Sequence, residues 1–285
     1  MTRKLNFLVA AILLFSFNSL AFQGQKLQEQ VDLTSKITGH TEIKGNTKLK
    51  DRHAQESREI VADFLKNELS EFIDQVEIEN YSATGNNVVG TIMATTKTDE
   101  WVVLGAHYDS VKDCPGANDN ASGVALVYSV AKHIAGLNSR KYNMKIVFFD
   151  EEERGLIGSK AYAKKLKDEK FNIVSVHTID QMGWDNDGDR GFELEMPTEA
   201  LKDHYLKVAK DYGYEFPIHM STVTSTDHRS FRNVGFNAIG LTEEYVNKDT
   251  TPHYHKPTDT FETINFEYLG TITVYVQKVF EELLK

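Results

Sequence analysis

Helix-like and strand-like hydrophobic patterns alternate along this chain from about residue 51 onward. Apolar side chains recur at helical spacing in residues 51–69, 122–135, 158–166, 197–212 and 266–284. Between these segments, apolar runs rich in β-branched and aromatic residues predict strands at residues 76–81, 87–94, 101–106, 144–149, 172–179, 191–196 and 236–242. Strands that alternate with helices are typical of an α/β fold, with a mostly parallel or mixed central sheet and helices on both faces.

The first 21 residues have the pattern of a cleavable signal peptide. Arg3 and Lys4 precede an apolar run over residues 7–17, and Ser19-Leu20-Ala21 offers small residues for cleavage. The run is too short to span a bilayer, although an uncleaved anchor remains the alternative. We therefore expect a secreted or periplasmic protein with no stable membrane association.

The remaining chain divides into two parts. Residues 22–50 are polar and poorly patterned, and they suggest an N-terminal arm or a short pro-like segment, whereas residues 51–285 suit one catalytic domain. The net charge of −10 and the lack of a long basic cluster argue against a nucleic-acid partner. Cys114 is the only cysteine, which excludes an intramolecular disulfide. We expect a monomer.

Four consecutive acids, Asp150 to Glu153, follow the predicted strand 144–149 directly. Adjacent carboxylates at the end of a buried strand repel one another and lose hydration, which is costly unless cations occupy the site. A solvated helix start is the plainer explanation, and it suits Glu151 best. The pattern thus indicates a metal site and calls for further ligands elsewhere in the chain.

Other candidate ligands also follow predicted strands. His107 comes after strand 101–106, Asp180 after strand 172–179, and His255 lies in a loop before the last helix. Asp119 lies in a Gly- and Asn-rich loop that opens a helix, where it could instead act as a helix cap. Because ligands bind beyond the carboxyl ends of parallel strands, we expect these side chains to converge.

Three motifs resemble the co-catalytic di-zinc aminopeptidases of the secreted leucyl-aminopeptidase type, which are related to glutamate carboxypeptidase and glutaminyl cyclase. They are Gly-Ala-His-Tyr-Asp-Ser at 105–110, Gly-Ala-Asn-Asp-Asn-Ala-Ser-Gly at 116–123 and Glu-Glu-Arg-Gly-Leu-Ile-Gly-Ser at 152–159. The resemblance covers residues from about 85 to 265 in the family's order. It implies a zinc-exopeptidase fold of the phosphorylase/hydrolase-like type.

The resemblance also implies two Zn²⁺ ions per chain and a residue set to hold them. His107 and Asp180 would bind one zinc, and Glu153 and His255 the other, while Asp119 would bridge the two. The family pattern His-x-Pro-x-Asp-Thr selects the second histidine of the last loop. Imidazole and carboxylate ligands suit zinc, and two such ions can share a water molecule and clamp an amide oxygen.

The same resemblance implies catalytic and orienting roles for neighbouring residues. Glu152 would be the general base, and Asp109 would orient His107. The acid run contains two Glu-Glu pairs, and the family spacing selects the later one. Tyr254 would donate a hydrogen bond to the oxygen of the tetrahedral intermediate, although a packing or rim role is equally open.

These roles together predict a secreted metallo-exopeptidase that removes the N-terminal residue of a peptide or small protein by attack of a zinc-bridging hydroxide. One alternative is a glutaminyl-peptide cyclotransferase with a single zinc. A second is a carboxypeptidase of the same fold, which needs a basic residue such as Arg154, Arg229 or Arg232 for the substrate carboxylate. A non-catalytic binding module is the third.

Residues outside the three motifs indicate the walls of the site. Thr226–Phe231 resembles the family's Ser-Asp-His-x-x-Phe segment, and we expect Asp227 and His228 to shape the wall without binding metal. Met182, Trp184 and Phe231 suggest an apolar pocket for the first residue of the substrate.

Overall fold

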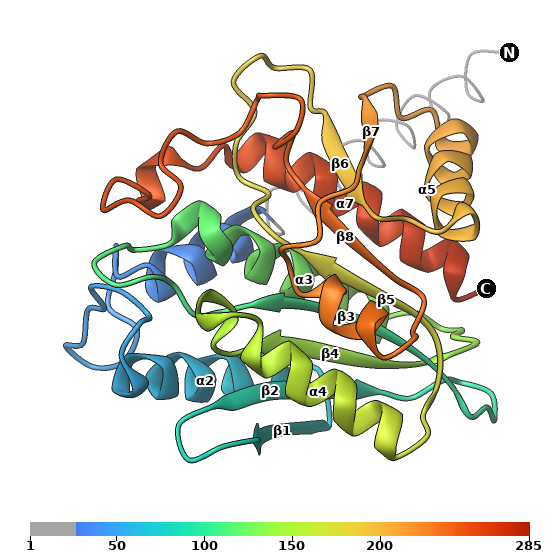
Figure 1. Cartoon of the computed structure of the whole chain (residues 1–285), viewed down its shortest axis with the longest axis horizontal. Coiled ribbons are helices and arrows are strands. Elements are labelled where there is room, and N and C mark those ends of the chain that lie inside the picture. The colour runs from blue at the N-terminus through green and yellow to red at the C-terminus, as the bar shows by residue number, and fades with distance from the viewer. Residues whose placement is uncertain (1–26) are drawn as a thin grey trace, which may run out of the picture.

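An eight-stranded mixed sheet forms the centre of the structure, a computed structural model that describes residues 27–285 (Figure 1). The strands are β1 (Gln75–Asn80), β2 (Asn86–Ile92), β3 (Glu100–His107), β4 (Asn143–Phe149), β5 (Asn172–Ile179), β6 (Phe192–Glu195), β7 (Ile218–Ser221) and β8 (Ala238–Thr242). Their order across the sheet is β1-β2-β4-β3-β5-β8-β6-β7. The central strands β4, β3, β5 and β8 are parallel, whereas β1, β2 and β6 introduce antiparallel pairs.

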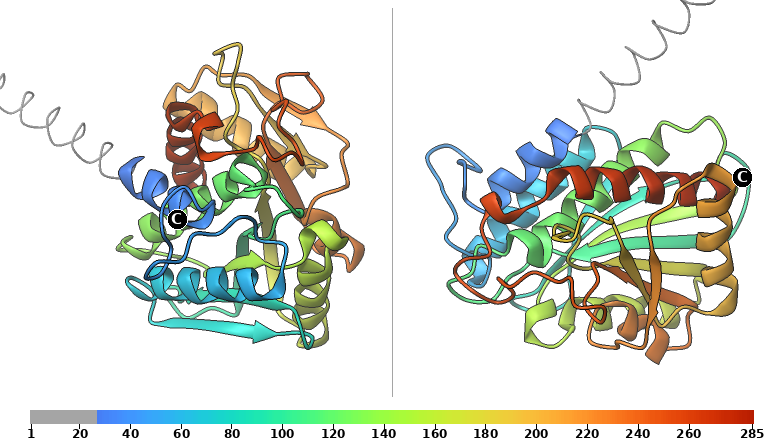
Figure 2. Two further views of the ribbon diagram at one scale, coloured as in Figure 1. Left: turned by 90° about the vertical axis from the view of Figure 1, so that its left-hand side faces the viewer. Right: turned by 90° about the horizontal axis from the view of Figure 1, so that it is seen from above.

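Helices cover both faces of this sheet, which confirms the predicted architecture. They are α2 (Gln55–Ser70), α3 (Gly123–Ala135), α4 (Ile157–Asp168), α5 (Glu199–Tyr212), α6 (His228–Asn233) and α7 (Phe266–Leu283). The larger apolar core contains residues of α2, α3, α5 and α7, and the smaller core contains residues of α4 and α6. In the right-hand view of Figure 2, the red α7 and the yellow-green α4 lie on opposite sides of the strands.

The central strands are apolar on both faces because both faces are covered. In β3, Val102 and Leu104 point into the larger core, whereas Val103 points into the smaller one. Successive side chains of a strand alternate between faces, so a strand buried on both sides reads as an uninterrupted hydrophobic run. This explains why residues 101–106 and 144–149 were recognisable as strands from the sequence alone.

The described part of the N-terminal segment packs against the larger core. Residues 27–37 are helical, and Leu33, Ile37, Ile43 and Leu49 are buried in that core. Within the described residues, no helix has the length and apolarity needed to cross a membrane. The predicted signal peptide, residues 1–21, lies outside the described residues.

Candidate metal centre

The carboxyl ends of three neighbouring parallel strands place most of the predicted site residues. His107 is the last residue of β3, and Asp180 follows β5 immediately. Glu152 and Glu153 lie in a short 3-10 turn, Glu152–Arg154, just after β4. Because β4, β3 and β5 are adjacent and parallel, these ends meet at one edge of the sheet.

The five predicted metal ligands form two groups that share Asp119. In the first group, His107 Nε2 lies 3.2 Å from Asp119 Oδ1 and 3.4 Å from Asp180 Oδ1. In the second, His255 Nε2 lies 3.1 Å from Asp119 Oδ2 and 2.9 Å from Glu153 Oε2. In each group, the three candidate ligand atoms lie within 4.8 Å of one another. Each carboxylate oxygen of Asp119 therefore faces a different group.

Several buried atoms at this site have no hydrogen-bond partner. They are both ring nitrogens of His107, Oε1 of Glu153 and Oδ1 of Asp180. Buried polar atoms without partners are costly, and native proteins rarely leave them so. Bound cations would satisfy them, and a set of imidazoles and carboxylates suits zinc. The residues present thus fit the implied metal.

The electrostatics of the site also favour a bound cation. Burial, together with repulsion from the charge of Asp119, raises the pKa of Glu153 to about 7. Burial raises the pKa of Asp180 to about 6. Burial also acts on Asp119, but the close imidazoles of His107 and His255 hold its pKa below the usual range. Hydrogen bonds to Asp119 and Glu153 raise the pKa of His255 to about 10. Crowded buried carboxylates of this kind are stabilised in their charged form by positive charge.

Asp259 holds the loop that presents Asp119. Its Oδ1 accepts a 2.8 Å hydrogen bond from the backbone N–H of Asn118, and its Oδ2 accepts one of 3.1 Å from that of Asp119. On the other side of the loop, the side chain of Asn120 donates to the carbonyl of Ile179 at the end of β5. The orientation of Asp119 is therefore fixed from two directions.

Asp109 connects His107 to the acidic turn. Its Oδ1 accepts a 3.0 Å hydrogen bond from the backbone N–H of Glu152, and its Oδ2 accepts one of 3.2 Å from that of Glu153. The same Oδ1 lies 3.4 Å from Nδ1 of His107. Asp109 thus lies where the sequence placed it, beside His107, and also fixes the turn that carries the two glutamates.

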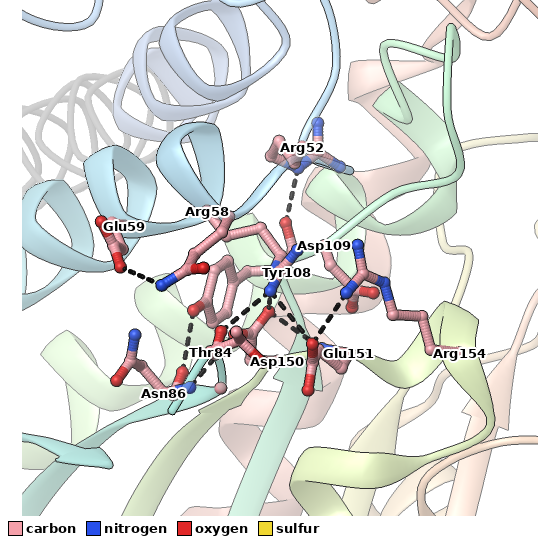
Figure 3. A network of polar contacts seen from close by, with 12 residues as sticks. Arg52, Arg58, Glu59, Thr84, Asn86, Tyr108, Asp109, Asp150, Glu151 and Arg154 are labelled. Atoms are coloured by element: carbon pink, nitrogen blue, oxygen red, sulfur yellow. Dashed lines mark hydrogen bonds and ion pairs between the residues drawn. The ribbon is translucent and has the colours of Figure 1, made fainter. Parts of the chain in front are cut away.

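The earlier acids of the run, Asp150 and Glu151, pair with arginines (Figure 3). Arg58 Nε lies 2.7 Å from Asp150 Oδ1, and its terminal nitrogen lies 3.1 Å from Glu151 Oε1. Arg154 also pairs with Glu151, at 2.9 Å. Glu151 is therefore held in a structural ion-pair network, whereas Glu152 lines the cavity at the site.

A second buried arginine, Arg52, fixes the connection between His107 and the Asp119 loop. Its guanidinium donates to the backbone carbonyls of Tyr108, Pro115 and Gly116. Burial lowers the pKa of Arg52, and nearby Asp259 opposes that effect. Nothing in the sequence pattern had singled out this residue, because its partners are carbonyl groups that carry no sequence signature.

A small cavity of about 70 Å³, open to solvent, lies at the metal groups. It is lined by Asp119, Glu152, Glu153, Asp180, Gln181, Glu195, Val223, Ser225, Thr226, Thr242, Tyr245, Tyr254 and His255. The ring of Tyr254 stacks on that of His255, with centroids 3.8 Å apart, and the side chain is 43% exposed. Burial of the hydroxyl raises the pKa of Tyr254, so the hydroxyl stays a hydrogen-bond donor at neutral pH.

The three arginines considered for binding a substrate carboxylate do not line this cavity. Arg154 pairs with Glu151, Arg229 donates to Asn233 of its own helix, and Arg232 donates to backbone carbonyls. The arginines therefore support the surrounding structure.

The walls of the cavity differ from the apolar pocket that the sequence suggested. Met182 is fully buried in the larger core and Phe231 in the smaller one, and neither of them nor Trp184 lines the cavity. Glu195 and Thr226 lie in the wall instead. Asp227 and His228 are buried directly beside Thr226, as expected for a wall segment.

Comparisons with known proteins agree with this arrangement. The model of a family described as Peptidase family M28 matches residues 87–279. Aminopeptidase YwaD of Bacillus subtilis is 28% identical over 194 residues, which cover 65% of this chain and 42% of that protein. The chain spans about half or less of the length of the first curated relatives that it matches.

Two solved structures show the same fold at lower identity. BSAP, a zinc aminopeptidase from Bacillus subtilis, is 24% identical with a TM-score of 0.65, over 70% of this chain and 50% of that chain. A glutaminyl cyclase from Bacteroides thetaiotaomicron is 17% identical with a TM-score of 0.71, over 89% of this chain and 97% of that chain.

Proposed function

The chain belongs to peptidase family M28, in line with its resemblance to di-zinc aminopeptidases, and on that premise we propose that it is a zinc-dependent aminopeptidase. The observation that carries the proposal is the pair of three-residue groups that share Asp119. His107 and Asp180 would hold one zinc ion with Asp119, and Glu153 and His255 would hold a second.

The residues around the two groups have distinct tasks in peptide hydrolysis. Zinc ions held there would polarise the scissile carbonyl and make a water molecule more acidic. Glu152 lines the cavity, and burial raises its pKa well above the usual value, so its carboxylate can accept a proton from water and donate it to the leaving amine. The Tyr254 hydroxyl, which stays protonated, would donate a hydrogen bond to the oxygen of the tetrahedral intermediate.

The charge of the cavity favours substrates with a free N-terminus over substrates with a free C-terminus. Its lining contains five carboxylates and no Lys or Arg among the described residues. A carboxypeptidase needs a cation for the terminal carboxylate of its substrate, whereas an acidic cavity attracts an ammonium group. We therefore assign the substrates as peptides or small proteins with a free N-terminus.

Glutaminyl-peptide cyclisation is the second candidate, because the likeness to the Bacteroides cyclase covers nearly the whole of that chain. Metal content and product separate the two functions. An aminopeptidase of the proposed kind binds two zinc ions per chain and hydrolyses aminoacyl nitroanilides, whereas the cyclase alternative binds one and forms pyroglutamate from an N-terminal glutamine.

Replacing Glu152 tests the proposed base. We expect Glu152→Gln to lower kcat by about 10²–10⁴-fold, because proton transfer is lost, while both zinc ions remain bound. Turnover on a panel of aminoacyl nitroanilides and zinc per chain by atomic absorption measure the two effects. Glu199→Gln is the matched control, since the Glu199 side chain is 84% exposed on α5. Full activity of Glu152→Gln would show that another group, with Glu151 first to be tested, is the base.

We also propose that the protein acts outside the cytoplasm. The support is the signal-peptide pattern of residues 1–21, which ends in small residues suited to cleavage. A monomeric state stays a prediction.

A further inference from the structure

One carboxylate in the cavity has no role in the proposed metal centre. Glu195, the last residue of β6, lines the cavity but is only 1% exposed. In the sheet, β8 separates β6 from β5, the strand that precedes Asp180. Neighbouring strands lie about 4.8 Å apart, so Glu195 lies on a strand roughly 10 Å from β5.

The sheet leaves room for this carboxylate at Gly240. Glu195 is paired with Gly240 across the antiparallel β6–β8 ladder. A Cβ atom at position 240 would lie 2.3 Å from Glu195 Oε2 and 2.7 Å from His228 Nδ1. Both distances are shorter than any van der Waals contact, so a larger residue at position 240 would displace the Glu195 carboxylate or His228.

Glu195 and the neighbouring His228 share the hydroxyl of Thr226. Thr226 Oγ1 lies 2.7 Å from Glu195 Oε2 and 2.7 Å from His228 Nδ1, so its hydroxyl can donate to the carboxylate while it accepts from the imidazole. The other ring nitrogen, Nε2 of His228, is buried without a partner. The imidazole and the Glu195 carboxylate therefore both contact the Thr226 hydroxyl.

Among the described residues, neither Lys nor Arg compensates the negative charge of Glu195. Across residues 27–285, the only ion-pair partner recorded for Glu195 is His228, at 3.4 Å, and neither Lys nor Arg lines the cavity. The wall beside Glu195 carries the polar side chains of Gln181, Ser225 and Thr242. Substrate pockets are usually apolar, so this polar wall around a buried carboxylate points to a cationic ligand.

We propose that Glu195 binds the cationic side chain of the first substrate residue, so that the enzyme prefers peptides that begin with Lys or Arg. The inference rests on the proposed aminopeptidase function. The α-ammonium group is one carbon away from the scissile carbonyl, and therefore stays near Glu152 and the metal groups. A carboxylate two strands farther along the sheet suits the end of a long side chain, with four methylene groups between Cα and the ammonium of lysine.

Kinetics on matched substrates test the assignment. We expect kcat/KM for lysyl p-nitroanilide to exceed that for the uncharged norleucyl analogue by about 10- to 100-fold, as befits a charge-assisted hydrogen bond. Glu195→Gln should abolish this preference by lowering kcat/KM for the lysyl substrate. Glu199→Gln, which removes an exposed charge four residues away, should keep the preference. A norleucyl preference in the unmodified enzyme, or an unchanged ratio in Glu195→Gln, would overturn the inference.

A binding measurement separates this inference from the proposed function. The zinc-loaded protein should be stabilised against heat by L-lysinamide more than by L-norleucinamide, and Glu195→Gln should lose the difference. If no aminoacyl nitroanilide is hydrolysed, the aminopeptidase proposal fails, and the binding difference still decides the role of Glu195. Equal stabilisation by both amides contradicts that role even in an active enzyme.

Discussion

At the scale of single residues, the site depends on side chains that orient other side chains. Asp259 has no predicted contact with metal, yet its two carboxylate oxygens accept the backbone N–H groups of Asn118 and Asp119. Burial raises the pKa of Asp259 to about 6, and these two hydrogen bonds oppose the effect. Residues that orient metal ligands in this way tune metal affinity from a distance.

Replacing Asp259 should therefore weaken zinc binding. An amide oxygen in Asp259→Asn can accept only one of the two N–H groups well, so Asp119 loses its fixed direction. We expect zinc affinity to fall by about 10–100-fold, measured by competition with a chromophoric chelator. Asp168→Asn, at an exposed position that pairs with Lys164, is the control. An affinity equal to that of the unmodified protein would mean that the loop holds Asp119 without Asp259.

The sequence identified residues that lie in long motifs and overlooked those that do not. His107, Asp119 and Glu153 were found because each lies in a run of several unusual residues. Glu195 ends a four-residue strand and resembles an ordinary turn acid, and no motif surrounds it. The role proposed for Glu195 follows from its contacts with Gly240 and Thr226, which lie 45 and 31 positions away in the chain.

At the scale of elements, apolar content decided which segments were predictable. The central strands were found within one or two residues, because burial on both faces makes them continuous hydrophobic runs. β7 and α6 were missed, since they have four and six residues and include polar ones such as His219 and Arg229. Segments this short cannot show a clear period. α6 begins at His228, which lies 3.4 Å from Glu195 behind the cavity wall.

A buried ion pair between Arg58 of α2 and the acids Asp150 and Glu151 attaches the loop after β4 to that helix. Arg58→Met would leave Asp150 and Glu151 without their shared cation in a buried setting. Removing one partner of such a pair usually costs about 3–5 kcal/mol in the free energy of unfolding, and we expect that loss in urea denaturation.

A double variant gives the control for this pair. Adding Asp150→Asn to Arg58→Met removes one of the stranded charges, so part of the lost stability should return. A single-variant loss below about 1 kcal/mol, typical of an exposed pair, would contradict a structural role for Arg58.

At the scale of the whole molecule, one buried histidine in the sheet should affect how stability depends on pH. His177, in β5, lies between the hydroxyls of Tyr205 and Ser175, each 2.9 Å away. Burial lowers its pKa to about 3, whereas an unfolded chain has a value of about 6.5. Between these values the unfolded chain binds a proton that the folded chain does not. This contribution to stability is therefore complete above pH 6.5 and is lost as pH falls towards 3.

Comparing two variants of the chain at two pH values isolates this effect. From pH 7.5 to pH 5, the His177 contribution should decrease by about 2 kcal/mol, and His177→Gln should lack that decrease. Buried carboxylates such as Glu243, whose pKa burial raises to about 8, act in the opposite direction in both proteins. The difference between the two proteins, measured by chemical denaturation, removes their effect. Identical pH dependence in both would show that His177 titrates normally.

The fold class was predictable from the alternation of patterns, but the order of strands was not. Pairing of β1 with β2 and of β6 with β8 adds antiparallel strands to a parallel centre. These pairings depend on contacts between distant segments, which local hydrophobic periodicity does not encode. The structure itself gives the strand order, and its fold is shared by the Bacillus aminopeptidase and the Bacteroides cyclase.

The end of β3, the loop that carries Asp119 and the distant loop that carries His255 must come together before Asp119 meets both of its histidines. A chain caught halfway through folding would thus lack the paired groups on which the proposed activity depends. Recovery of metal uptake after denaturation would, for the same reason, report that these distant segments have met.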